Sequence, residues 1–180
     1  MNNIENHNLI SSYKKVYSTL SQVHERMKAD NGNSLAPINV SSSEELAYLL
    51  KNYFVEAKIC KAGNGKECFP VYKHLNGSKV AESTINNTPS IVLTDGTLLL
   101  LNLNSSSCTS SLELKQNIGC FRVRADLNGL KNPNTVGKDI HDFYFIEDKV
   151  IARGDPLTTT KLNDGNGFAQ GYKILTTGKI

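Results

Sequence analysis

A stretch rich in turn-forming residues, 125–139, most constrains how this chain can fold. It holds two glycines, one proline, three asparagines and two aspartates. An alternating segment, 121–124, precedes it, and an apolar, aromatic run, 143–146, follows it. Because a tight hairpin needs far fewer turn formers, we expect a structured loop, lined with oxygen atoms, between two strands of an antiparallel sheet. It is called the oxygen-rich loop below.

The first segment of the chain has the spacing of an amphipathic helix. Apolar side chains recur three and four residues apart between Ile10 and Met27, and polar side chains cover the opposite side. Residues 30–33 (Asp-Asn-Gly-Asn) form a strong stop signal. The pattern predicts an N-terminal helix over 1–29 whose apolar stripe packs on the rest of the domain.

A second helix is predicted to start at 41–43 and to run to about Val55. Ser42 and Glu45 have the spacing of a capping box, in which the Glu45 carboxylate reaches back to the amide of the cap residue. The residues after it, 61–89, are expected to be irregular and rich in turns. We therefore assign 30–89 to the second helix and a variable loop region.

The remainder, 90–180, is predicted to form an antiparallel sheet and C-terminal loops. One hairpin turns at Asp95-Gly96, another pairs 143–146 with 150–152, and a short segment, 171–175, closes the chain. Two helices followed only by strands is an α+β order, with the N-terminal helix on one face of the sheet. The 180 residues suit a single domain, 1–180.

The four cysteines indicate the compartment in which the chain folds. They form no CxxC pair and have no histidine cluster beside them, which argues against zinc. Disulfides Cys60–Cys68 and Cys108–Cys120 are the economical pairing because each closes a short loop, and the two other connectivities stay open. Disulfides indicate maturation outside the reducing cytosol, in the periplasm or at the cell surface.

Charge and hydropathy exclude some partners. The net charge is only +3 and the basic residues are scattered, so we expect no nucleic-acid partner. No apolar segment of roughly 18 residues and no signal peptide is present. An exported domain without an export signal is expected to be a soluble truncation of a longer protein.

No motif of a known catalytic site occurs, and we predict that the chain is not an enzyme. The four histidines are dispersed and are expected on the surface or on a helix face, so a Ser–His–Asp triad is unsupported. Two carboxylate pairs have structural explanations. Glu44-Glu45 caps the second helix, and Glu147-Asp148 lies at a solvated hairpin tip.

The oxygen-rich loop is the one place where the sequence suggests a metal. Hard oxygen ligands for calcium are available from Asp126, Asn128, the Leu130 carbonyl, Asn134 and Asp139. It is not an EF-hand, because Gly137 occupies the twelfth position, where a bidentate Glu is required. The alternative is that these side chains bind amides of their own loop without a metal.

The run from Cys120 to Phe143 resembles the C-terminal motif of pilin-like proteins, the subunits of type IV pili and type II secretion pseudopili. The likeness rests on Asp126-Leu-Asn128-Gly129, Pro133-Asn134 and Gly137-Lys-Asp139, followed by a Phe-rich strand. The helical segment 13–22 is similar to the soluble half of the pilin N-terminal helix, and 171–174 to a C-terminal segment. The middle of the chain, 31–107, matches poorly.

The resemblance implies a pilin-like α+β fold and the role of a filament subunit. In that family a hydrophobic N-terminal half-helix, absent here, anchors the precursor in the inner membrane and binds other pilins or pseudopilins in the filament. Related major pseudopilins bind calcium in a C-terminal loop. The alternative function is an exported or surface-anchored binding module for carbohydrate or protein, which exposed aromatics within 69–72 would favour.

Overall fold

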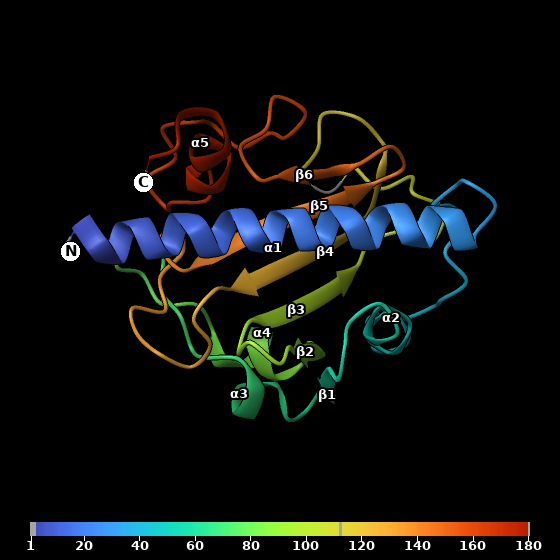
Figure 1. Ribbon diagram of the computed structural model, residues 1–180, viewed down its shortest axis with the longest axis horizontal. Coiled ribbons are helices and arrows are strands. Elements are labelled where there is room, and N and C mark those ends of the chain that lie inside the picture. The colour runs from blue at the N-terminus through green and yellow to red at the C-terminus, as the bar shows by residue number, and fades with distance from the viewer. Residues whose placement is uncertain (1–2, 112, 180) are drawn as a thin grey trace.

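One long helix crosses the face of an antiparallel sheet in the computed structural model, which describes residues 3–111 and 113–179 (Figure 1). This helix, α1 (Asn3–Asp30), matches the predicted helix over residues 3–29 and ends one residue later than expected, while the first two predicted positions lie outside the described residues. The apolar stripe predicted for it is buried: Tyr13, Val16, Leu20, Val23 and Met27 are each at most 5 % exposed. No helix among the described residues combines the length and apolar character needed to cross a membrane.

The sheet has six strands that follow one another in chain order, and all neighbours are antiparallel. The strands are β1 (Lys58–Cys60), β2 (Ser90–Val92), β3 (Leu98–Leu103), β4 (Gly119–Asp126), β5 (Ile140–Ile146) and β6 (Val150–Ala152). Both predicted hairpins and the strand before the oxygen-rich loop are therefore confirmed, as is the α+β class.

Alternation along the strands gives the sheet two different faces. The helix face packs against α1 and is apolar: Leu99, Leu101, Phe121, Val123, Phe143 and Phe145 are all buried there. Tyr13 of α1 stacks on Phe143, with ring centroids 5.4 Å apart. The opposite face, called the arginine face, carries Leu98, Leu100, Arg122, Arg124, Asp142 and Tyr144.

The second helix, α2 (Ser43–Lys51), is capped at its N-terminus as predicted, with a shift of one residue. Ser42 Oγ accepts from the Glu45 amide at 3.1 Å. The Glu45 carboxylate accepts from the amide of Ser41, at 2.7 Å, rather than from that of Ser42. The helix ends at Lys51, four residues before the predicted Val55, and leaves Val55 80 % exposed.

Three short elements were not predicted. The region expected to be irregular contains α3 (Gly65–Cys68) and α4 (Glu82–Asn86), and Cys60 belongs to edge strand β1.

The C-terminal segment, predicted to lie among the strands, is a helix, α5 (Gln170–Thr177). It lies so close to α1 that a Cβ on Gly171 would approach the Tyr13 hydroxyl to 2.7 Å. This tertiary contact, which local sequence does not show, accompanies the helical conformation.

Glu147 was predicted to lie at a solvated hairpin tip. It does lie in the turn between β5 and β6, but it binds the segment that follows α1 instead of facing solvent. Its carboxylate accepts from Ser34 Oγ at 2.6 Å and from the amides of Leu35 and Ala36 at 3.0 and 2.9 Å. The turn between β5 and β6 is thereby joined to the segment that leads from α1 to α2.

Both predicted disulfides are present. Cys60–Cys68 joins β1 to α3, and Cys108–Cys120 joins the loop after β3 to β4. Two disulfides in one domain are typical of a protein that folds in an oxidising compartment, outside the cytosol.

Candidate functional site

The oxygen-rich loop leaves the sheet after β4 and returns to it at β5. The Leu127 amide donates to the Asp139 carbonyl at 2.8 Å and closes its two ends. Val136 donates to the Lys73 carbonyl at 2.9 Å, and Lys73 donates to the Asn134 carbonyl at 3.1 Å. The loop is therefore fixed both to the sheet and to the segment around Lys73.

Gly129 shows why this loop needs glycine. Its φ of +73° lies in the left-handed region, and a Cβ there would be 2.8 Å from the Gly96 carbonyl oxygen. The loop thus lies directly against the Asp95-Gly96 turn of the β2–β3 hairpin. A larger residue would have to push the two turns apart.

The two loop carboxylates, Asp126 and Asp139, are fully buried. Asp126 Oδ1 accepts from the Asn128 amide at 3.1 Å. The Asp139 carboxylate accepts from the amides of Asn134 and Thr135 at 2.8 and 2.7 Å. Three of the four carboxylate oxygens therefore bind loop amides, which is the metal-free role considered from the sequence.

The electrostatics of this pair are unfavourable for two free anions. Burial, and after it the nearby Asp139, raises the pKa of Asp126 to about 8, against the opposing effect of two backbone amides. Burial also raises the pKa of Asp139, although the amides of Thr135 and Asn134 oppose it. Without a cation, the Asp126 carboxyl group is mostly protonated at neutral pH.

Three buried oxygens of the loop have no hydrogen-bond partner: Asp126 Oδ2, Asn128 Oδ1 and Asn134 Oδ1. Buried polar atoms are nearly always partnered, so such a group needs an explanation. These atoms and Asp139 are the hard oxygen donors that calcium prefers, and the residues fit that ion. Leu130 is the exception: its side chain is 59 % exposed, and no contact of the described residues connects its carbonyl to the other four.

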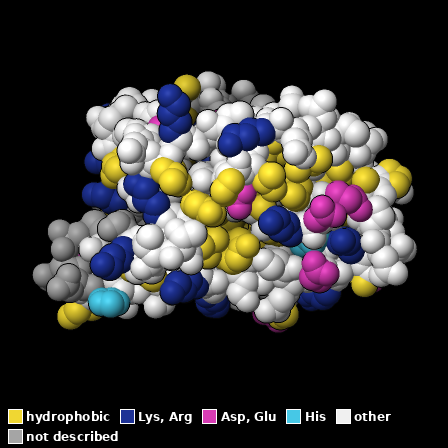
Figure 2. Space-filling view, turned by 90° about the horizontal axis from the view of Figure 1, so that it is seen from above, with side chains coloured by type: hydrophobic (Ala, Val, Ile, Leu, Met, Phe, Trp, Pro, Cys, Tyr) yellow, Lys and Arg dark blue, Asp and Glu magenta, His cyan; other side chains and the backbone are white. Residues whose placement is uncertain are grey.

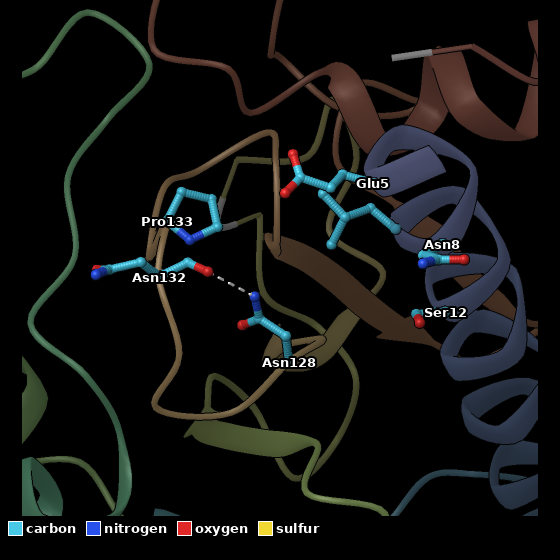
Figure 3. A pocket seen from close by; sticks show the side chains of 7 residues that line it. Glu5, Asn8, Ser12, Asn128, Asn132 and Pro133 are labelled. Carbon is cyan, nitrogen blue, oxygen red and sulfur yellow. Dashed lines mark hydrogen bonds between the residues drawn. The ribbon is translucent and has the colours of Figure 1, made fainter. Parts of the chain in front are cut away.

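A hollow of about 440 Å³ separates the loop from the start of α1 (Figure 3). Its walls are Glu5, Asn8, Leu9 and Ser12 from the helix and Asn128, Asn132 and Pro133 from the loop. Asn128 Nδ2 donates to the Asn132 carbonyl at 3.1 Å across the loop. The oxygen-rich loop and the first turns of α1 thus border the same space.

The arginine face holds a row of alternating charged side chains that the local sequence did not predict. Arg124 binds both oxygens of Asp142 at 2.6 and 2.7 Å, and Arg153 binds Asp142 at 2.9 Å. Arg153 also binds Glu113 at 2.7 Å, and Arg122 lies 3.5 Å from Glu113. These ion pairs, called the charged chain below, connect five side chains in the order Arg124, Asp142, Arg153, Glu113, Arg122.

Neighbouring aromatic side chains enclose the charged chain. The Arg153 guanidinium lies 3.5 Å from the centre of the Phe168 ring. Tyr72 accepts a hydrogen bond from Arg124, and Tyr144 donates one to Glu113. Burial alone would raise the pKa of Asp142, but Arg124, Arg122 and Arg153 outweigh it and hold that pKa far below its usual value. Asp142 is therefore an anion throughout the physiological range.

The alternation of Arg122 with Arg124, and of Asp142 with Tyr144, was the available signal for this cluster. Polar residues two apart on a strand share one face, and such a face is ordinarily assigned to solvent. Here the segments around Tyr72 and Phe168 cover it, which the local sequence does not indicate.

Several aromatic and histidine side chains are more buried than the sequence suggested. Phe69 and Tyr72, whose exposure would have favoured a binding module, are 0 and 1 % exposed and belong to a core cluster on the arginine face. His24 lies on the buried side of α1, as expected for a helix-face residue, whereas His141 is buried on strand β5 rather than on the surface or on a helix face. Burial lowers the pKa of His141 to about 4, against its contact with the Lys138 carbonyl.

Comparison of the chain with protein-family models, with curated proteins and with solved structures found no match. The comparisons give no enzyme family, and nothing in the described part of the chain points to catalysis.

Proposed function

We propose that this chain is a structural subunit of the pilin type, a pilin of a type IV pilus or a pseudopilin of a type II secretion system. The observation that carries the proposal is the form of α1. Its 28 residues, at about 1.5 Å each, make a helix about 42 Å long that runs across the whole domain (Figure 1).

The two ends of α1 differ in what they contact. From Tyr13 onward the apolar stripe is buried against the helix face of the sheet. The first turns are open, with Ile4 73 % exposed, and the N-terminal end lies at the edge of the molecule (Figure 1). A filament subunit needs such a helix end for contacts with its neighbours, while the sheet holds the other end.

The surface supports the same role. Figure 2 shows the side of the molecule where α5 and β6 lie, and hydrophobic side chains form a band across its middle, with charged groups around them. Contiguous apolar surface marks protein contacts. In the proposed subunit these contacts are with other pilins or pseudopilins, at the cell surface or in the periplasm, after anchoring in the inner membrane.

A substitution at the open end of α1 tests this proposal. Ile4→Asp should leave the melting temperature of the isolated domain unchanged, because the side chain is exposed. In cells that carry the native gene, it should remove the subunit from sheared surface filaments. Val55→Asp, at a position 80 % exposed after α2, is the matched control and should assemble normally.

The native gene offers a second test. The coding sequence upstream of Asn2 should specify a short basic leader and roughly 20 apolar residues. An ordinary cleavable signal peptide there, or filaments unaffected by Ile4→Asp, would contradict the assignment to the pilin type.

We further propose that the oxygen-rich loop of this subunit binds calcium through Asp126, Asn128, Asn134 and Asp139. The support is that Asp126, Asn128 and Asn134 each have a buried side-chain oxygen without a hydrogen-bond partner, and that the buried carboxylate of Asp139 lies in the same loop. A divalent cation would compensate both carboxylates and release the proton of Asp126, so affinity should rise with pH.

Calorimetry of the isolated domain checks this proposal. Excess calcium should raise the melting temperature relative to EDTA, since a ligand that binds only the folded state stabilises it. Asp126→Asn should abolish the rise, and Asp148→Asn, at an exposed position, should retain it. Identical melting of the wild type in calcium and in EDTA would leave the loop with its metal-free role.

A further inference from the structure

A small cavity lies on the arginine face between α4 and strands β3 and β4. Its volume is about 40 Å³. It is lined by Thr84, Thr88, Leu100, Asn102, Arg122 and Arg124. A water molecule needs roughly 10–15 Å³ of such space, so the cavity has room for a few waters or one small ion.

The lining is cationic. Two arginines contribute to it, and no carboxylate does. Asn102 Oδ1 already accepts from Asn104 Nδ2 at 3.1 Å, and no described hydrogen bond uses Asn102 Nδ2. The groups left to face a ligand are therefore N–H donors and hydroxyls, which is the chemistry of an anion site.

The charged chain on this face begins and ends with the arginines of the cavity. Asp142 lies between Arg124 and Arg153, and Glu113 lies between Arg153 and Arg122. Three positive charges thus meet two negative charges, which leaves one positive charge uncompensated.

Arg122 has the least direct ion pairing of the three arginines. Its guanidinium has one ion pair among the described residues, at 3.5 Å, although its side chain is only 22 % exposed. Arg124 instead binds both oxygens of Asp142. Because the two arginines are two residues apart on β4, they share one face of the strand and lie side by side at the cavity.

We infer that this cavity binds a small monovalent anion of chloride size, held between Arg122 and Arg124 with Asn102 and Thr84 as further donors. One negative charge there balances the surplus and joins the two ends of the charged chain. The size of the cavity excludes bulky organic anions, and the single surplus charge favours a halide over a divalent oxyanion. This site is separate from the oxygen-rich loop and does not depend on the pilin assignment.

The test uses the whole domain at constant ionic strength, with sodium chloride exchanged for sodium gluconate, whose anion is too large to enter. Chloride should raise the melting temperature in a saturable way, by about 2–4 °C when it exceeds its dissociation constant about fivefold. Arg122→Met should lose this rise. Arg26→Gln, which alters an exposed arginine of α1, should keep it.

A crystal of the wild-type domain soaked in bromide supplies the readout that needs no variant. Anomalous scattering should place one bromide between the guanidinium groups of Arg122 and Arg124. Equal melting in both salts, a chloride response that survives in Arg122→Met, or a cavity that contains only water would each overturn the inference.

Discussion

The two faces of the sheet belong to the same strands but are stabilised by different interactions, apolar contacts on one and buried ion pairs on the other. On β4, Val123 points into an apolar core shared with α1, while Arg122 and Arg124 on either side of it point into a charged cluster. Val123 is 0 % and Arg124 is 8 % exposed, so both faces are covered. Burial alone therefore does not distinguish them.

The difference lies in how each face responds to the loss of one group. Apolar contacts are non-directional and add roughly in proportion to the area buried. Buried charges cost several kcal/mol each in desolvation and depend on their partners. The helix face should therefore lose stability gradually, whereas the arginine face should depend sharply on a single carboxylate.

Asp142→Asn should produce the largest effect. It leaves Arg124 and Arg153 without their shared anion, and breaking a buried pair typically costs about 3–5 kcal/mol. Urea unfolding measures this loss. The double variant Arg124→Met, Asp142→Leu removes both charges and should be much less destabilised than Asp142→Asn, and a double variant that is worse than the single would contradict the pairing argument.

Val123→Ala tests the helix face at the neighbouring position of the same strand. Removal of two buried carbon atoms should cost about 2 kcal/mol, from lost transfer free energy and a small cavity. Urea unfolding again gives the value, and Val55→Ala, at an exposed position, is the control. A loss as large as that of Asp142→Asn would remove the distinction between the faces.

The pH dependence of unfolding should separate the oxygen-rich loop from the helix face by its sign. Asp126 keeps its proton in the folded state up to about pH 8 but loses it near pH 4 when unfolded, so its contribution falls as pH rises between these values. His141, on the helix face, has a folded pKa of about 4 and an unfolded pKa of about 6.5, so its contribution rises with pH in that range.

The window from about pH 6.5 to about pH 8 therefore reports on Asp126, because the His141 contribution is already complete above its unfolded pKa of about 6.5. In EDTA, the free energy of unfolding should fall by up to about 1.4 kcal/mol per pH unit in this window. Asp126→Asn, which resembles the protonated acid, should flatten the slope. An unchanged slope in that variant would show that Asp126 is ionised below pH 6.5.

Much of this fold could be predicted from local patterns. Helical spacing predicted α1, the Asp95-Gly96 turn predicted the β2–β3 hairpin, and short cysteine separations predicted both disulfides. These features depend on residues near one another in sequence, where steric and hydrogen-bonding preferences act directly. The oxygen-rich loop was likewise recognised from its turn formers, and four of its five candidate ligands lie together.

Tertiary structure alone decided the rest. The helical conformation of α5 accompanies the contact of Gly171 with Tyr13, and Glu147 is half-buried because the link after α1 lies over it. The alternation in β4 placed Arg122 and Arg124 on one face, but only the covering segments around Tyr72 and Phe168 made that face an interior. Sequence fixes which side chains share a face, whereas the cost of burying their charge depends on what distant segments bring to meet them.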